Sequence, residues 1–95
     1  MNNQYCVYIL MNKLNSVMYV GYTSNLCKRI YDHKNKVIKS FTSRYNITKL
    51  VYYEVYDDMQ TAKHRERQIK NWKRIWKLEL IMNQNPTLKD LSNHL

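Results

Sequence analysis

Residues that interrupt or link secondary structure are scarce, because the 95-residue sequence has one glycine and one proline. Linkers between domains are typically rich in Gly, Ser or Pro, so this composition argues against a second domain. The chain also has no internal repeat and no low-complexity tract. We therefore expect a single small domain over residues 1–85, followed by a tail or short helix over residues 86–95.

Cysteine and long apolar runs are scarce as well. Cys6 and Cys27 fall in a predicted strand and a predicted helix, which indicates reduced thiols rather than a disulfide framework. No stretch approaches the roughly 18 apolar residues of a transmembrane helix, and the first residues lack the pattern of a signal peptide. We therefore expect a soluble, cytoplasmic protein.

Acidic residues are outnumbered, with 7 Asp and Glu against 16 Lys and Arg and a net charge of +9. The cations gather in two blocks, Lys28 to Lys49 and Lys63 to Lys77, each with seven basic residues and one acid. Such clustering predicts a polyanionic partner, with nucleic acid first and an anionic membrane surface second. The candidate nucleic-acid contacts are Lys28, Lys34, Lys36, Arg44, Arg65, Lys70 and Lys73.

Two apolar and aromatic runs near the start predict a β-hairpin. The first, Tyr5–Met11, is apolar on both alternating faces, which is typical of a central strand. In the second, Val17–Ser24, we expect Gly21 to end the strand, at a point where a side chain would crowd whatever approaches the sheet. We expect Tyr8 and Tyr19 to share one face, opposite each other or displaced by two residues, which requires an even number of loop residues.

The next segments alternate between helical and extended patterns. A helix is predicted from Ser24 to about Lys36, and it places Arg29 and His33 four residues apart on one side. From periodicity alone, His33 could equally be a packed histidine at the core edge, and Arg29 a solvated charge. Residues 37–49 have no clear period and predict a partly ordered loop, and Leu50–Tyr56 predicts a third strand.

An acidic residue lies on the apolar stripe of the helix predicted from about Met59 to Trp72. Stepping by three or four residues along this helix places Glu66 on the inward side. A carboxylate covered by protein is costly unless it is paired or binds a metal. Two readings therefore stay open: a metal ligand, or an ion pair with a cation such as Arg29, Arg65 or Lys70.

The chain is expected to remain helical to Met82, with a core face made of Trp72, Ile75, Trp76 and Leu80. Asn85-Pro86 then ends the helix, because proline lacks the backbone donor that a helix requires. These elements predict an α+β domain, a three-stranded antiparallel sheet flanked by helices. The expected order is strand, strand, helix, strand, helix, helix.

The hairpin carries a spaced pair, Cys6-Val7-Tyr8 and Tyr19-Val20-Gly21, followed by Thr23, Leu26, Arg29 and His33. This pattern resembles the GIY-YIG nuclease domain, specifically its small stand-alone bacterial (URI-type) branch. Further matching segments are Phe41–Asn46, Leu50–Glu54, Arg65–Lys70, Trp72, Trp76-Lys77, Leu80-Ile81 and Asn85-Pro86. The resemblance covers about nine tenths of the chain and implies the GIY-YIG fold.

The resemblance also implies a chemistry, hydrolysis of phosphodiester bonds by water attacking phosphorus in line with the departing 3′ oxygen. It implies one divalent ion, Mg²⁺ or Mn²⁺, held by Glu66, and a phosphate contact from Arg29. Tyr19 would shape the site, and either Tyr8 or His33 would accept the proton. We expect an endonuclease acting on DNA, structure-directed or nonspecific, in repair or processing, as a monomer or homodimer. The alternative is a catalytically weak nucleic-acid-binding adaptor of the same fold.

Three features depart from the family pattern. Cys6 replaces the first signature glycine, and valine replaces both signature isoleucines, which are packing positions. Leu78 stands where many family nucleases have an asparagine beyond the metal-binding glutamate. The chain also has no room for the separate recognition domain of larger relatives, so any specificity must come from nucleic-acid structure, a partner or an oligomer.

Overall fold

A three-stranded antiparallel sheet forms the centre of the computed structural model, which describes residues 4–36 and 41–95. The strands are β1 (Tyr5–Met11), β2 (Met18–Thr23) and β3 (Lys49–Tyr56), in the spatial order β2-β1-β3. β1 pairs with both neighbours and is buried from Cys6 to Met11. The prediction that this strand is central is therefore confirmed.

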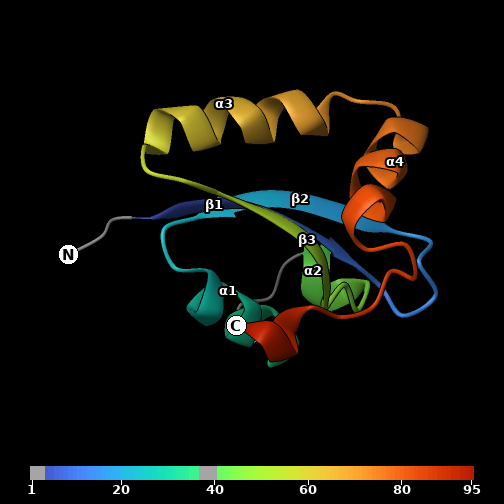
Figure 1. The fold of residues 1–95 in the computed structure, drawn as a ribbon. Helices are drawn as coiled ribbons and strands as arrows, with labels where there is room; N and C mark the ends of the chain where they lie inside the picture. Colours follow the sequence, from blue (N-terminus) through green and yellow to red (C-terminus); the bar gives the residue numbers. More distant parts are fainter. Residues whose placement is uncertain (1–3, 37–40) are drawn as a thin grey trace.

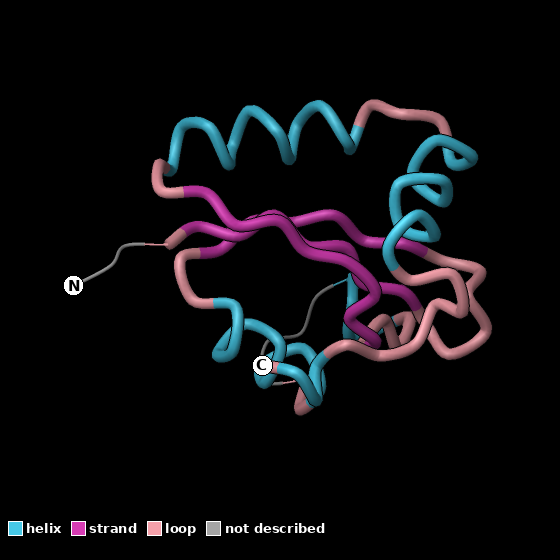
Figure 2. Tube along the Cα trace, viewed as in Figure 1, coloured by secondary structure: helices cyan, strands magenta, loops and turns pink. Residues whose placement is uncertain are grey.

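Helices cover both faces of the sheet (Figure 1). On one face lie α1 (Leu26–Lys34) and α2 (Phe41–Arg44), with the 3₁₀ turn η1 (Ser92–His94) beside them. On the other face lie α3 (Met59–Lys70) and α4 (Arg74–Gln84), as the tube in Figure 2 also shows. The predicted α+β fold and its order of main elements are confirmed. Across the described ranges, every helix is too short or too polar to cross a membrane.

The sheet separates two hydrophobic cores, one under each helical layer. The core under α3 and α4 consists of Val7, Ile9, Met11, Val20, Val51, Tyr52, Ala62, Ile69 and Ile81. The core under α1 and α2 consists of Cys6, Tyr8, Leu10, Leu26, Ile30, Ile47 and Leu50. Because successive side chains of β1 alternate between the two cores, Tyr8 necessarily faces α1.

The hairpin register places Tyr8 and Tyr19 on one face. Tyr8 pairs with Gly21 and Leu10 pairs with Tyr19, so the two tyrosines are displaced by two residues. The connection from residue 12 to residue 17 has an even number of residues, which confirms the expected parity. β2 continues beyond Gly21 to Thr23, so the glycine lies inside the strand and does not end it.

The predicted loop over residues 37–49 is wrong for Phe41–Arg44, which form α2, while residues 37–40 lie outside the described residues. This helix is a single turn, too short to show a helical period in the sequence. It is fixed from outside, because the Ile47 amide donates to the Thr42 carbonyl at 2.9 Å and Ile47 is fully buried. Tertiary packing therefore holds a turn that local sequence does not specify.

The two helices predicted after Met59 are expected to follow each other directly at Trp72, whereas residues 71–73 separate α3 from α4. The interruption changes the helical phase, so the predicted core face is only partly correct. Trp72 and Leu80 pack against the core under α3 and α4, but Ile75 is 56% exposed and Trp76 is 49% exposed. With Met82, α4 thus leaves three large apolar side chains exposed at the surface.

Candidate active site

Three rings meet on the α1 side of the sheet, from Tyr8, Tyr19 and His33. The ring centroids lie 6.2 Å apart for Tyr8 and Tyr19, 5.9 Å for Tyr8 and His33, and 5.8 Å for Tyr19 and His33. The Tyr8 hydroxyl forms a hydrogen bond with His33 Nε2 at 3.3 Å. Asn25 caps the start of α1 by accepting from the Lys28 amide, which fixes the helix that presents His33 to the tyrosines.

The Tyr8 hydroxyl occupies the space that a side chain at Gly21 would need. A Cβ built on Gly21 would lie 2.6 Å from the Tyr8 hydroxyl oxygen and 3.0 Å from the Tyr19 ring. Tyr8 is fully buried, whereas Tyr19 is half-buried. The expectation that Gly21 avoids crowding holds, but the group that it accommodates is the catalytic candidate Tyr8 itself.

Burial and nearby charges set the protonation of this cluster. Burial, reinforced by Tyr19, raises the pKa of Tyr8, and Arg29 opposes this rise through its charge and as a hydrogen-bond donor. Burial and then the charge of Arg29 lower the pKa of His33, against the opposite effect of Asp32. At neutral pH Tyr8 therefore keeps its proton and the His33 imidazole is neutral and able to accept one.

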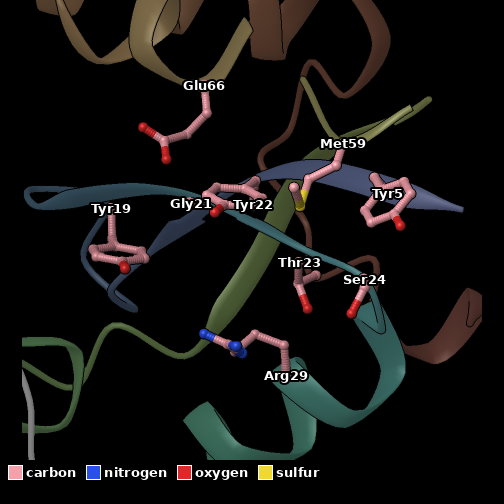
Figure 3. Close-up of a pocket in the computed structure, with 9 residues that line it drawn as sticks. All are labelled: Tyr5, Tyr19, Gly21, Tyr22, Thr23, Ser24, Arg29, Met59 and Glu66. Carbon is pink, nitrogen blue, oxygen red and sulfur yellow. The ribbon is translucent and has the colours of Figure 1, made fainter. Parts of the chain in front are cut away.

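A pocket of about 520 Å³ opens at the β2 edge of the sheet. Glu66 enters it from α3 on one side of the strand and Arg29 from α1 on the other, with Tyr19 between them (Figure 3). The described residues that line it are Tyr5, Tyr19, Gly21, Tyr22, Thr23, Ser24, Arg29, Met59 and Glu66. Because β2 is an edge strand, side chains from both helical layers reach one opening.

Glu66 has the properties of a ligand for a hydrated divalent cation. It is the only acid among the described residues that line the pocket, and its side chain is 14% exposed. Lys70 Nζ lies 3.3 Å from its carboxylate, so the ion-pair alternative is present together with the pocket position. Within residues 4–36 and 41–95, no group of three or more His, Cys, Asp or Glu could hold a metal. A single carboxylate suits Mg²⁺, which commonly keeps several waters and binds substrate phosphate.

Comparison with protein families matches residues 4–79 to the GIY-YIG catalytic domain. The chain belongs to the GIY-YIG family. This result confirms the resemblance given by the tyrosine pair of the hairpin.

Relatives of similar length carry the name UPF0213. A UPF0213 protein of Clostridium perfringens is 40% identical over 79 residues, covering 83% of this chain and 84% of that protein. A UPF0213 protein of Syntrophus aciditrophicus is 38% identical over 81 residues, covering 84% and 91%. The solution NMR structure of a UPF0213 protein from Bacillus halodurans has a TM-score of 0.58, 25% identity and 92% coverage of both chains. The fold of this GIY-YIG chain is thus shared by a protein whose structure was solved by NMR.

The structure brings the predicted site residues of the GIY-YIG chain together in two layers. Tyr19, Arg29 and Glu66 line the pocket, and Tyr8 and His33 lie directly behind Tyr19 and Gly21. Their separate catalytic roles stay predictions.

The candidate nucleic-acid contacts on α1 are exposed but engaged. Lys28 Nζ lies 3.1 Å from Asp32, although the lysine side chain is 70% exposed. Lys34 Nζ lies 2.6 Å from Asp90 in the C-terminal segment. Lys36 is exposed just after the helix. Surface pairs of this kind are weak and can exchange for phosphate, so these contacts stay predictions.

Among the other candidate nucleic-acid contacts, some cations already contact other side chains of the protein. Arg65 donates from Nε and Nη2 to the two oxygens of Glu54, at 2.9 and 3.0 Å, and this fork ties α3 to β3. Lys73 Nζ lies 5.6 Å from the centroid of the Trp76 ring. Arg44 is exposed on α2. Of the seven predicted contacts, Arg65 has the clearest structural use of its own.

Sequence reasoning did not predict two features of the site, one behind the pocket and one in its lining. Thr42 lies in the segment expected to be a loop, yet its hydroxyl is 2.8 Å from His33 Nδ1. Tyr22 and Met59 line the pocket although their types and spacing are equally typical of core residues. Only the assembled sheet edge places them beside Glu66.

Proposed function

We propose that this chain is a metal-dependent endonuclease that hydrolyses phosphodiester bonds of DNA, structure-directed or nonspecific, in repair or processing. The observation that carries the proposal is the meeting of Arg29 and Glu66 across one pocket that Tyr19 also lines, with the rings of Tyr8 and His33 packed behind Tyr19. A nucleic-acid-binding module would not require a neutral imidazole hydrogen-bonded to a buried tyrosine. The net charge of +9 supports a polyanionic substrate.

The residues can be assigned complementary tasks. Arg29 binds the phosphate and neutralises the charge that develops on it, using donors in a fork geometry. Glu66 holds a divalent ion, which would supply Lewis-acid stabilisation of the phosphate and of the leaving 3′ oxygen. Tyr19, which lines the pocket, orients the attacking water. Tyr8 lies behind the pocket lining and takes a proton from that water when the water reaches it past Tyr19, as it passes its own proton to His33 Nε2, 3.3 Å away.

This assignment makes His33 the final proton acceptor, which follows from the two pKa shifts. Tyr8 with a raised pKa is a poor base by itself at neutral pH. His33 with a lowered pKa is neutral there and can accept the tyrosine proton as the water is deprotonated. The pair therefore behaves as one base, and the phenolate exists only transiently.

The direct test is nicking of supercoiled plasmid and cleavage of a branched DNA with Mg²⁺, with Mn²⁺ and with chelator. We expect cleavage that requires the metal and falls about a hundredfold in Arg29→Met, because one pre-positioned donor to the reacting phosphate is lost. Arg67→Met is the matched control, since Arg67 is an exposed arginine of α3 and the charge change is identical.

Three outcomes would separate the readings. Equal losses in both arginine variants would mean that only net charge matters. Cleavage that persists in chelator would contradict the metal requirement. Salt-sensitive binding without cleavage on either substrate would favour the adaptor of the same fold.

The cleavage rate should depend on pH through His33. Because its folded pKa is lowered, the rate should rise with a midpoint below about pH 6.5 and then stay level through neutrality. No descending limb from tyrosine ionisation is expected below about pH 10, because the pKa of Tyr8 is raised. Single-turnover rates at constant ionic strength measure the profile, with His64→Gln as the exposed-histidine control.

The same shift has a consequence for folding stability, and its sign is fixed by linkage. Folding favours neutral His33, so the stabilisation is present above about pH 6.5 and is lost as the pH falls through the folded pKa. For cleavage, a rate profile whose acidic limb is unchanged in His33→Gln would contradict the assignment of His33 as the proton acceptor.

A further inference from the structure

The second ring nitrogen of His33 has its own partner, in a helix that is not part of the pocket. Thr42 Oγ1 lies 2.8 Å from His33 Nδ1, and Thr42 is 2% exposed. The Thr42 carbonyl accepts the amide of fully buried Ile47 at 2.9 Å, so the core holds this residue in place. The three groups therefore form a chain: the threonine hydroxyl, the imidazole and the Tyr8 hydroxyl.

A count of protons relates the direction of this chain to the group that accepts from Tyr8. Arg29 can only donate, so the Tyr8 oxygen accepts from it, and Tyr8 gives its single proton either to Tyr19 or to His33 Nε2. His33 Nε2, at 3.3 Å, is an acceptor only when the imidazole proton is on Nδ1. Nδ1–H then donates to Thr42 Oγ1, and the 2.8 Å separation suits that bond.

We propose that Thr42 is a positioning residue that sets the tautomer of His33, keeping the Nε2 lone pair directed at the Tyr8 hydroxyl. Its catalytic consequence rests on the proposed function, in which Nε2 receives the Tyr8 proton and His33 becomes the imidazolium. With Nδ1–H held by threonine, the imidazole cannot present Nε2–H to tyrosine, which would block that transfer. Thr42 itself touches neither the water nor the phosphate.

The test compares Thr42→Val, which removes the hydroxyl at similar shape, with Thr42→Ser, which keeps it. Imidazole ¹⁵N chemical shifts of histidine-labelled protein at pH 8 report which nitrogen carries the proton. Spectra of His64→Gln and His94→Gln assign the His33 signals. We expect Nδ1–H in the wild type and in Thr42→Ser, and a shift of most molecules to Nε2–H in Thr42→Val.

The Nδ1–H tautomer retained in Thr42→Val, or Nε2–H already present in the wild type, would overturn the proposal. Thermal unfolding of both variants checks that they fold. If Thr42→Val does not fold, the tautomers of the wild type and Thr42→Ser still decide the matter, because Nε2–H in either one refutes it.

Cleavage then tests the consequence separately. Thr42→Val should cleave DNA about tenfold to hundredfold more slowly, and Thr42→Ser within a few-fold of the wild type, as for other partners that orient a histidine. A changed tautomer with unchanged cleavage would overturn the catalytic role. A wild-type chain that cleaves nothing would refute the proposed function, yet the NMR result on Thr42 would stand.

Discussion

Replacing Glu66 by glutamine is expected to lower metal-dependent cleavage by at least about a thousandfold while DNA binding persists. Glu66 is the single described acid lining the pocket, so its loss removes the charged group that would hold the divalent ion. Stabilisation of the reacting phosphate by such an ion contributes several kcal/mol, and each 1.4 kcal/mol corresponds to about tenfold in rate. Glutamine preserves the shape but not the charge.

The Glu66→Gln variant should fold normally, which makes the activity loss interpretable. Its ion-pair partner, Lys70, has a side chain that is 50% exposed, and solvent screens an i,i+4 pair of this kind. Removing the pair should change the free energy of unfolding by less than about 1 kcal/mol. Urea denaturation measures the stability, and single-turnover cleavage over a range of Mg²⁺ concentrations measures the activity.

Glu79→Gln on α4 is the matched control, because it makes the same chemical change at an exposed position outside this pocket. Cleavage by the control should stay close to the wild-type rate. If Glu66→Gln and Glu79→Gln cleave equally well, Glu66 does not hold the ion. If Glu66→Gln instead loses DNA binding, its role lies in forming the pocket rather than in the reaction.

The sheet and the tyrosine pair could be predicted because local pattern determines them. The doubly apolar Tyr5–Met11 run specifies a central strand, and the period of two residues specifies that Tyr8 and Tyr19 share a face. Helical spacing likewise predicted that Glu66 faces inward between Ala62 and Ile69, which are both buried. In each case one strong periodicity runs through the whole element.

The remaining features depend on contacts between distant segments. The turn at Phe41–Arg44 is held by buried Ile47, and nothing in its own residues distinguishes it from a loop. In the sequence Arg65 is one more cation of a basic block. Its partner in the structure is Glu54, eleven residues earlier on β3, and no local pattern indicates that pair. Periodicity shows which side of a helix is covered, but it does not identify the group that an individual charge meets.

The location of the pocket follows from the sheet order rather than from any motif. β2 is an edge strand, so Arg29 below the sheet and Glu66 above it can approach the same phosphate around that edge. A central strand would have kept the two helical layers apart. Because only one strand separates the two helical layers at this edge, side chains from both layers can contribute to one site in a domain of this size.

Replacing Gly21 by alanine should lower both the stability of the fold and the rate of cleavage, because the new side chain would clash with Tyr8. The added Cβ would lie 2.6 Å from the hydroxyl oxygen and 2.7 Å from Cζ of Tyr8, a rigid and fully buried ring. Gly21 does not adopt a positive φ, so the cost is steric rather than conformational. Overpacking of this kind destabilises by about 1–3 kcal/mol. Displacing the Tyr8 hydroxyl from His33 should also slow cleavage about 10²- to 10⁴-fold, the usual range for general base catalysis.

A double-mutant cycle with Tyr8→Leu identifies the cause. Leucine has no ring at the clash, so urea denaturation should show that Gly21→Ala costs less in the Tyr8→Leu background than in the wild type. The coupling should be at least about 0.5 kcal/mol. Cleavage should not recover in the double variant, because the hydroxyl that donates to His33 is absent. If the two substitutions change the free energy of unfolding additively, Gly21→Ala does not act through a direct clash with Tyr8. If cleavage recovers in the double variant, Tyr8 is not on the proton path, and Gly21 serves only the packing of the strand.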